Sequence, residues 1–410
     1  MKNFMFDSEN LPQKYTILVN IKRYLCRNFL IMRNFTLILL IISTQILSAQ
    51  DTKVPFTFDN GTTRMKVGGY VQNVVASDFG GAINNHDFIV STLTVPESWD
   101  QQSRFAIDAT ASRINLDVTH KTGSFGDIRF FMESDFKGAS NVLRLRHAYL
   151  SVLGIIAGQT WSFMYDADAT ANTIDIQGVN SRTFFRTPLL GYTGKFSEHF
   201  SAGISLEFPN ARITAAGPVS SVTQTVPDIP VFIQYKSGLG HLKLAGVFRT
   251  VNYGLSDQEK IKAKQGLGVQ LTGSVKPVSA LTVYGQGIYG KGIARYINDL
   301  ASMNLDLLPE RTNPGNADVP VMFGASVGLR AEISKKVYLT SNFSIAQLDK
   351  KEGFTRDSDY RNSTYFSATL FWKAWQNLLF ATEYLYGERV NMNDDSGNSN
   401  RLQAMLRYSF

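Results

Sequence analysis

The amino-acid sequence predicts an all-β chain, a transmembrane antiparallel β-barrel of about 16 strands, with a range of roughly 14 to 18. Three observations carry this prediction. Apolar and polar residues alternate in segment after segment, the connections between segments alternate in length, and no apolar run after residue 50 is long enough for a membrane helix. The mean hydropathy is slightly negative, as expected when every second residue faces water.

The end of the chain shows the alternation most regularly. Between residues 401 and 410, one face carries Leu402, Ala404, Leu406, Tyr408 and Phe410, and the other face is mostly polar. An apolar face suits lipid and a polar face suits a wet lumen, although a half-buried edge strand of a soluble sandwich is the alternative for this segment alone. We interpret the aromatic terminus, with Tyr408 and Phe410, as the assembly signal that the barrel-assembly machinery reads.

Strand-like alternation recurs along the whole chain. A membrane strand needs about 9 to 11 residues, so a stretch as long as 142–159 is expected to hold two strands. The predicted strand segments are 64–75, 103–119, 127–135, 142–159, 183–196, 200–208, 230–236, 241–251, 266–275, 281–291, 321–333, 336–347, 361–373, 378–388 and 401–410.

The connections between these segments come in two lengths. Tight connections occur at 195–198, 236–240, 276–279 and 334–336, whereas long ones occupy 78–101, 292–316, 349–363 and 389–400. The long ones are rich in Asn, Asp, Gly and Ser, which predicts solvent-facing loops. Short periplasmic turns and long external loops are typical of outer-membrane barrels and are hard to obtain from a sandwich.

The N-terminus predicts export. Met32-Arg33-Asn34 is followed by an apolar run over 35–47 and then by Ser48-Ala49-Gln50, which is the pattern of a secretory signal peptide cleaved near Ala49. We therefore divide the chain into an upstream extension plus signal peptide (1–49, with Met32 as a possible start), a short periplasmic segment (50–63) and a single barrel domain (64–410). The expected location is the outer membrane of a Gram-negative bacterium, among outer-membrane lipid and lipopolysaccharide.

The leader also accounts for most of the positive charge. Residues 1–50 hold six Lys or Arg and two Asp or Glu, so only +3 of the formal +7 remains after cleavage, and a nucleic-acid partner loses its support. The single cysteine, Cys26, lies in the same leader. A mature chain without a thiol has neither a disulfide framework nor a cysteine metal site.

Arginine is concentrated on the predicted inward face of the first third of the barrel. Stacked guanidinium groups facing an acidic cluster would create a transverse field and offer fork-shaped donors to carboxylate or phosphate groups. The alternative is that these charges only solvate the wall and pair with each other. The inward residues are Arg104, Asp108, Arg113, Asn115, Asp117, Arg129, Glu133, Asp135, Arg144 and Arg146.

Short motifs in the same region resemble a known family. They are Ser103-Arg104-Phe105, Glu133-Ser134-Asp135-Phe136, Leu145-Arg146-His147-Ala148-Tyr149, Ala157-Gly158-Gln159-Thr160-Trp161, Asp166-Ala167-Asp168 and Phe185-Arg186-Thr187-Pro188. In this order and spacing they resemble the DcaP-like trimeric outer-membrane porins. The resemblance implies sixteen strands, a homotrimer, and passive diffusion of small solutes with a leaning toward negatively charged carboxylates.

The resemblance also implies a constriction loop. In that family the segment after the Gln-Thr-Trp motif folds into the barrel, which here places Trp161, Asp166, Asp168 and Asp175 on an inward-folded loop over about 161–181. The three aspartates would face the basic wall, and Arg182 and Arg186 would begin the next strand. Family members carry a periplasmic coiled coil before the barrel, whereas residues 51–63 contain no heptads, so a trimer here would lack that element.

We therefore predict an outer-membrane porin for small hydrophilic solutes, with a preference for small anions or (di)carboxylates. The alternatives are a barrel that displays surface loops as an adhesin or receptor and, least favoured, a barrel hydrolase. The histidines after the leader are His86, His120, His147, His199 and His241, and none belongs to a nucleophile elbow, an HExxH motif or a paired metal-ligand spacing. We expect no catalytic residue, no cofactor and no metal.

Overall fold

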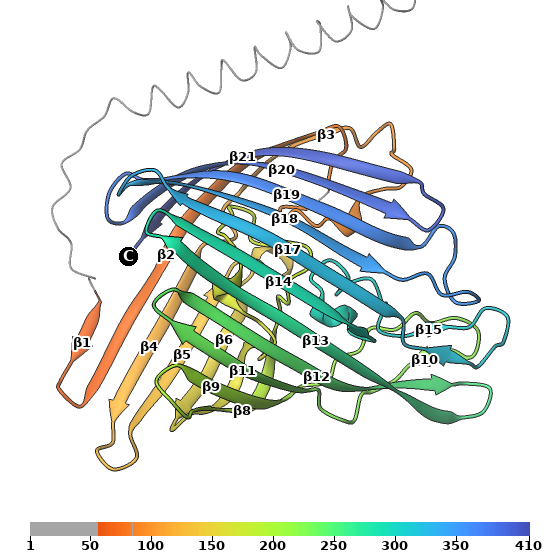
Figure 1. The fold of residues 1–410 in the computed structure, drawn as a ribbon, viewed down its shortest axis with the longest axis horizontal. Helices are drawn as coiled ribbons and strands as arrows, with labels where there is room; N and C mark the ends of the chain where they lie inside the picture. The colour runs from red at the N-terminus through yellow and green to blue at the C-terminus, as the bar shows by residue number, and fades with distance from the viewer. Residues whose placement is uncertain (1–55, 84) are drawn as a thin grey trace, which may run out of the picture. The chain divides into compact units, whose positions relative to one another are not determined.

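The structure is a computed structural model of the protein, and it describes residues 56–83 and 85–410. Over these residues the chain forms a closed antiparallel barrel of 16 strands (Figure 1). The predicted fold class and strand number are thus confirmed. Within the described residues, no helix has the length and apolar character needed to cross a membrane. The predicted signal peptide, with Met32 and Ala49, lies outside the described residues.

The wall begins with β2 (Thr63–Phe79), and the barrel closes where β2 pairs with the last strand, β21 (Ser396–Ser409). β3 (Ser103–Asp108) and β4 (Arg113–Lys121) pair with successive halves of β2 and together make one wall strand. The other wall strands are β5 (Asp127–Asp135), β6 (Arg144–Val152), β7 (Ile155–Trp161), β8 (Arg186–Lys195), β9 (Phe200–Glu207), β11 (Ile229–Ser237), β12 (Gly240–Leu255), β13 (Lys260–Val278), β14 (Leu281–Lys291), β17 (Val321–Glu332), β18 (Val337–Leu348), β19 (Tyr360–Lys373) and β20 (Leu378–Asn391).

Short elements decorate this wall. β1 forms a hairpin with β2, β10 pairs with one end of β12, and β15 pairs with β16 in a separate two-stranded sheet. Four single-turn 3-10 helices lie in the connections. The bounds are β1 (Thr57–Asp59), β10 (Val219–Ser221), β15 (Leu308–Pro309), β16 (Ala317–Asp318), η1 (Val90–Thr92), η2 (Ala139–Asn141), η3 (Ala167–Ala169) and η4 (Ala294–Tyr296).

Alternation in the sequence becomes alternation of exposure in the barrel. Phe105 and Ile107 on β3 are 66% and 59% exposed, and Leu406 on β21 is also exposed. Arg401 and Gln403, on the other row of β21, are almost completely buried. The apolar row therefore points out of the barrel and the polar row points into it, as the period of two predicts.

The strand boundaries follow the prediction with one main difference. The stretch 142–159 divides into β6 and β7 at a tight turn, as expected from its length. The hairpin of β12 and β13 is longer than predicted, because pairing continues from Asn252↔Ala263 to Leu255↔Lys260. Here the apolar row faces inward, since Val251 and Leu255 are buried in a cluster with Leu307. The other row holds Thr250, Asn252 and Gly254, so the alternation continues with the apolar row on the inner side.

The barrel interior holds three inward-folded segments, which we call loop A (80–102), loop B (162–185) and loop C (292–320). Loop A buries Phe88 and Val90 against Leu385 of the wall. Loop C buries Tyr296 and Leu300 in a cluster that also contains residues of β12, β14, β17 and β18. The prediction that 78–101 and 292–316 are solvent-facing loops is wrong for these parts, because average polarity conceals their clustered apolar residues.

Ion pairs fix loops A and C to the wall. At the closure seam, Arg401 on β21 binds Asp78 on β2 with both carboxylate oxygens (2.5 and 2.9 Å) and donates to the carbonyl of Asn85 in loop A (3.0 Å). Under loop C, Arg249 on β12 binds Asp228 (3.1 Å) and Asp306 (2.6 Å). These pairs are fully buried, so each charge depends on its partner for stabilisation.

We predict that Arg249→Ala destabilises the barrel by about 3–5 kcal/mol, because it leaves the buried carboxylate of Asp306 without its cation and leaves Asp228 with Arg295 alone. The midpoint of denaturant unfolding, followed by the mobility shift of the folded barrel, measures the change. The exposed pair of Arg64 and Asp59 (4.0 Å) supplies the control, and Arg64→Ala should change stability by less than about 1 kcal/mol. Equal effects of the two substitutions would contradict the prediction.

Candidate functional site: the constriction of the barrel

Loop B leaves β7 after Trp161 and runs along the inner wall before it returns to β8. Its backbone is held by wall side chains. The carboxylate of Glu383 on β20 accepts the N–H groups of Ile174 and Asp175, each at 2.9 Å. Asn342 on β18 accepts the N–H of Ala171 at 3.2 Å. The predicted inward-folded loop is thus confirmed, and its middle part is anchored on β18 and β20.

The loop covers a polar part of the wall that parity alone would assign to water. Small polar side chains on β18 and β19 are buried beneath it, and Ser344 hydrogen-bonds to both Asn180 and Ser181 of loop B. Sequence reasoning missed Glu383, Asn342 and Ser344 as anchors. The composition of the inner row could have indicated these anchors. On β18 and β19 the inner row is rich in Ser, Thr and Asn, whereas on β4–β6 it carries arginines.

The aspartates of loop B do not face the basic wall. Asp166 is buried and accepts hydrogen bonds from His241 (2.8 Å) and Thr272 (2.5 Å) on β12 and β13. Asp175 is buried and accepts the N–H groups of Phe88 and Gly178. Asp168 is exposed, 3.7 Å from Lys236. The expectation that all three oppose the arginines is wrong, because a buried carboxylate takes the position where several donors meet it.

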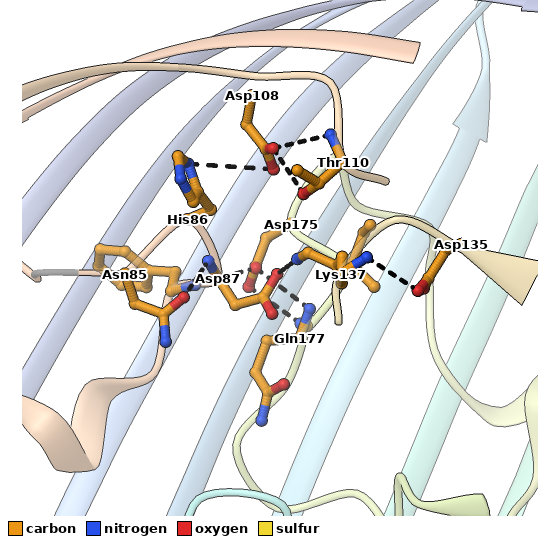
Figure 2. Close-up of polar contacts among 12 residues, drawn as sticks. Asn85, His86, Asp87, Asp108, Thr110, Asp135, Lys137, Asp175 and Gln177 are labelled. Carbon is orange, nitrogen blue, oxygen red and sulfur yellow. Dashed lines mark hydrogen bonds and ion pairs between the residues drawn. The ribbon is translucent and has the colours of Figure 1, made fainter. Parts of the chain in front are cut away.

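Asp175 lies where loops A and B meet the connection between β5 and β6 (Figure 2). In this junction Lys137 forms an ion pair with Asp87 of loop A, and the backbone N–H of Lys137 donates to Asp135 at 3.1 Å. His86 stands 3.9 Å from Asp108. The contacts fasten loop A to loop B and to the wall, so the inward segments form one connected body.

The junction predicts a pH effect on the channel. Burial, followed by the nearby negative charge of Asp87, raises the pKa of Asp175 to about 6. The folded junction therefore favours the protonated acid, and its stability falls as pH rises through about 6. We expect lower open-channel noise at pH 5 than at pH 7.5, and a smaller difference in Asp175→Asn. Asp168→Asn, on the exposed side of the same loop, should retain the wild-type difference; loss of the difference in this control instead would contradict the assignment.

An arginine cluster lies on the inner face of β4–β6. Arg146 on β6 binds Glu133 (2.6 Å) and Asp135 (2.8 Å) on β5. Arg144 also binds Asp135 at 2.7 Å, and Arg113 on β4 stands 3.4 Å from Glu133. Three guanidinium groups therefore share two carboxylates, which leaves a local excess of positive charge.

A β-bulge shapes this cluster. The pairing of β5 with β6 shifts between Glu133 and Ser134, so that Arg146 and its neighbour His147 are both buried. Simple parity cannot reveal such a bulge, because it inserts one residue into one strand only. The ring of His147 makes a hydrogen bond of 3.0 Å with Thr160, which gives this histidine a structural role.

Arg186 at the start of β8 adds a fourth guanidinium group. The guanidinium group of Arg186 lies 4.4 Å from the centre of the Trp161 ring. The ring of Tyr165 also stacks on Trp161, with ring centroids 4.2 Å apart. The charge of Arg186 interacts with those of Arg144 and Arg146. Among the described residues Arg186 has no carboxylate partner, and its Nη1 is buried without a hydrogen bond. No carboxylate among the described residues therefore neutralises the charge of Arg186 by a direct ion pair.

The other predicted lumen arginines have different surroundings. Arg104 donates to the carbonyls of Ile83 (3.2 Å) and Asn85 (2.6 Å) and so supports loop A. Arg129 binds Asp117 through two hydrogen bonds of 2.9 Å. Arg182 remains in loop B instead of beginning the strand, and it donates to the carbonyl of Ile176 at 2.7 Å. Of the predicted set, Arg113, Arg144, Arg146 and Arg186 gather with Glu133 and Asp135.

The C-terminal residue bonds to the first wall strand. Tyr408 is exposed on the outer row, and the N–H of Phe410 donates to Gly69 at 3.1 Å, so the assembly signal stays a prediction. Over residues 56–83 and 85–410, no three His, Cys, Asp or Glu side chains are placed together to hold a metal ion.

Comparison with known proteins now identifies the family. The family model of the porin subfamily matches residues 60–406. This chain belongs to the porin subfamily. No match is found among curated proteins.

Solved structures share this porin's fold. The outer-membrane channel DcaP of Acinetobacter baumannii superposes with a TM-score of 0.73 at 20% identity, over 86% of this chain and 99% of that chain. An anion-selective porin from Comamonas acidovorans gives 0.56 at 12% identity, over 85% and 100%. The trimer form of OmpT of Vibrio cholerae gives 0.55 at 10% identity, over 85% and 100%. The resemblance predicted from the motifs is confirmed at the level of the fold, and the protein is an outer-membrane channel of the porin type.

Proposed function

We propose that this porin passes small hydrophilic solutes by passive diffusion and prefers small anions, above all mono- and dicarboxylates. The observation that supports this preference most directly is Arg186, whose guanidinium group has no carboxylate partner among the described residues and lies beside the arginines of β6. Together, Arg113, Arg144, Arg146 and Arg186 oppose only Glu133 and Asp135. A local excess of guanidinium charge attracts anions and offers them paired donors.

The arrangement of loop B supports the same preference. Asp166 and Asp175 are held by donors of the wall and by loop backbone, so they do not neutralise the arginine cluster across the lumen. A porin with aspartates facing the arginines would instead have a transverse field with little net preference. The anion-selective porin from Comamonas acidovorans is a precedent for such selectivity on this fold.

The assembly of the protein is part of this proposal. We infer a homotrimer in the outer membrane of a Gram-negative bacterium, exported by the leader 1–49 and inserted by the barrel-assembly machinery among lipid and lipopolysaccharide. The trimer form of OmpT supports the oligomeric state by analogy of fold. The exposed apolar row of the barrel supports the lipid contact.

Reversal potentials across a salt gradient test the preference for anions. We predict that Arg186→Gln lowers the anion-to-cation permeability ratio by about tenfold, since one unit charge about 6 Å from a passing ion in water favours an anion and disfavours a cation by roughly 0.7 kcal/mol each. Arg144→Gln should shift the ratio in the same direction.

The control is Arg361→Gln. Arg361 pairs with Asp394 on the rim near the ends of β19 and β20, where exposed charges are screened by salt. This substitution should leave the ratio nearly unchanged. A barrel that carries no current, or an Arg186→Gln channel with wild-type selectivity, would refute the proposal.

A further inference from the structure

Loop C touches loop B directly in the barrel interior. The backbone N–H of Asn298 donates to the carbonyl of Arg182 at 2.9 Å, and the N–H of Asp299 donates to the carbonyl of Asn180 at 3.0 Å. Two successive residues of a turn in loop C thus donate to two carbonyls of a turn in loop B. Such backbone bonds fix both the distance and the register of the two loops.

The side chain of Asn298 strengthens the contact. Its Nδ2 donates to the carbonyls of Gln177 (2.8 Å) and Val179 (3.3 Å), and its Oδ1 accepts from the side chain of Gln177 at 2.5 Å. Asn298 is buried, and each of its polar atoms is used in binding loop B. A side chain that satisfies so many groups of one neighbour holds that neighbour in a single position.

Asp299 connects this part of loop C to the wall and to loop A. Its carboxylate accepts from Ser363 on β19 at 2.6 Å, and its carbonyl accepts from Ser91 in loop A at 2.7 Å. Neighbouring residues Ile297 and Leu300 are completely buried in the main apolar cluster. Both loops are thus anchored to the wall, and loop C adds the contact that holds residues 177–182 of loop B in place.

The part of loop B that is held in this way leads directly to the arginine cluster. Two residues after Arg182, the ring of Phe184 packs against Trp161 with ring centroids 4.9 Å apart. Trp161 in turn carries the guanidinium group of Arg186 at 4.4 Å. A displacement of loop B at residues 177–182 would therefore reach the group that we assign to anion attraction.

We propose that loop C is a second constriction element, and that Asn298 and Asp299 are positioning residues that set the width of the pore and the placement of Arg186 by clamping loop B. This inference rests on the proposed anion channel. It assigns pore size to a loop other than the one that the motifs indicate.

Single-channel recording of the purified full-length porin in planar bilayers tests this role. We expect Asn298→Ala to raise the conductance by about 1.5-fold or more, because the clamp on residues 177–182 of loop B is lost. The anion-to-cation permeability ratio should fall toward the value of Arg186→Gln. A residue with a merely structural role would change stability and leave selectivity as it is.

The matched control is Asn316→Ala. Asn316 lies in the same loop and bonds to Glu310 without touching loop B, so its substitution should leave conductance and selectivity unchanged. If Asn298→Ala does not fold, Gln177→Ala removes the same side-chain bond from the loop B side and should give a smaller change of the same sign.

The outcomes separate this inference from the proposed function. A folded Asn298→Ala channel, or a folded Gln177→Ala channel in its place, with wild-type conductance and selectivity would overturn the clamp while the anion channel stands. A wild-type barrel without current, or with no preference for anions, would instead refute the proposed function itself.

Discussion

A peptide segment inside a barrel has no neighbouring strand, so each of its N–H and C=O groups that is buried away from water must find a partner on the inner wall or on another loop. In this porin the wall supplies partners for loop B through short polar side chains and the carboxylates of Glu207 and Glu383. Glu383 receives two consecutive N–H groups of loop B, and Asn342 and Ser344 receive others. The position of the constriction follows from this requirement, because loop B lies where the acceptors are.

The same requirement distributes charge in the lumen. Carboxylates that hold loops are surrounded by donors, as Asp166 and Asp175 are, and they do not act across the open space. The arginines of β4–β8 have fewer acceptors than donors, and Arg186 has none of opposite charge among the residues that the structure describes. Excess positive charge therefore remains near the arginine cluster, because Asp166 and Asp175 are used to hold loop B.

Period and length were sufficient to predict the barrel, including the division of 142–159 into two strands. They were not sufficient where a β-bulge changes which residues face inward, or where a side chain binds a loop instead of the wall. The bulge before Arg146 is invisible to alternation, and Arg182 belongs to the loop because its guanidinium group binds loop backbone. The positions of Asp166 and of loop C depend on contacts between segments far apart in the chain, and no local sequence pattern predicts such contacts.

The ion pair of Arg401 and Asp78 joins the last strand to the first and also carries part of loop A. Loop A can therefore reach its final place only after β21 has arrived. A chain that still lacked β21 would have no Arg401 to hold Asp78 and the carbonyl of Asn85. The lining of the interior on this side is thus a property of the completed ring.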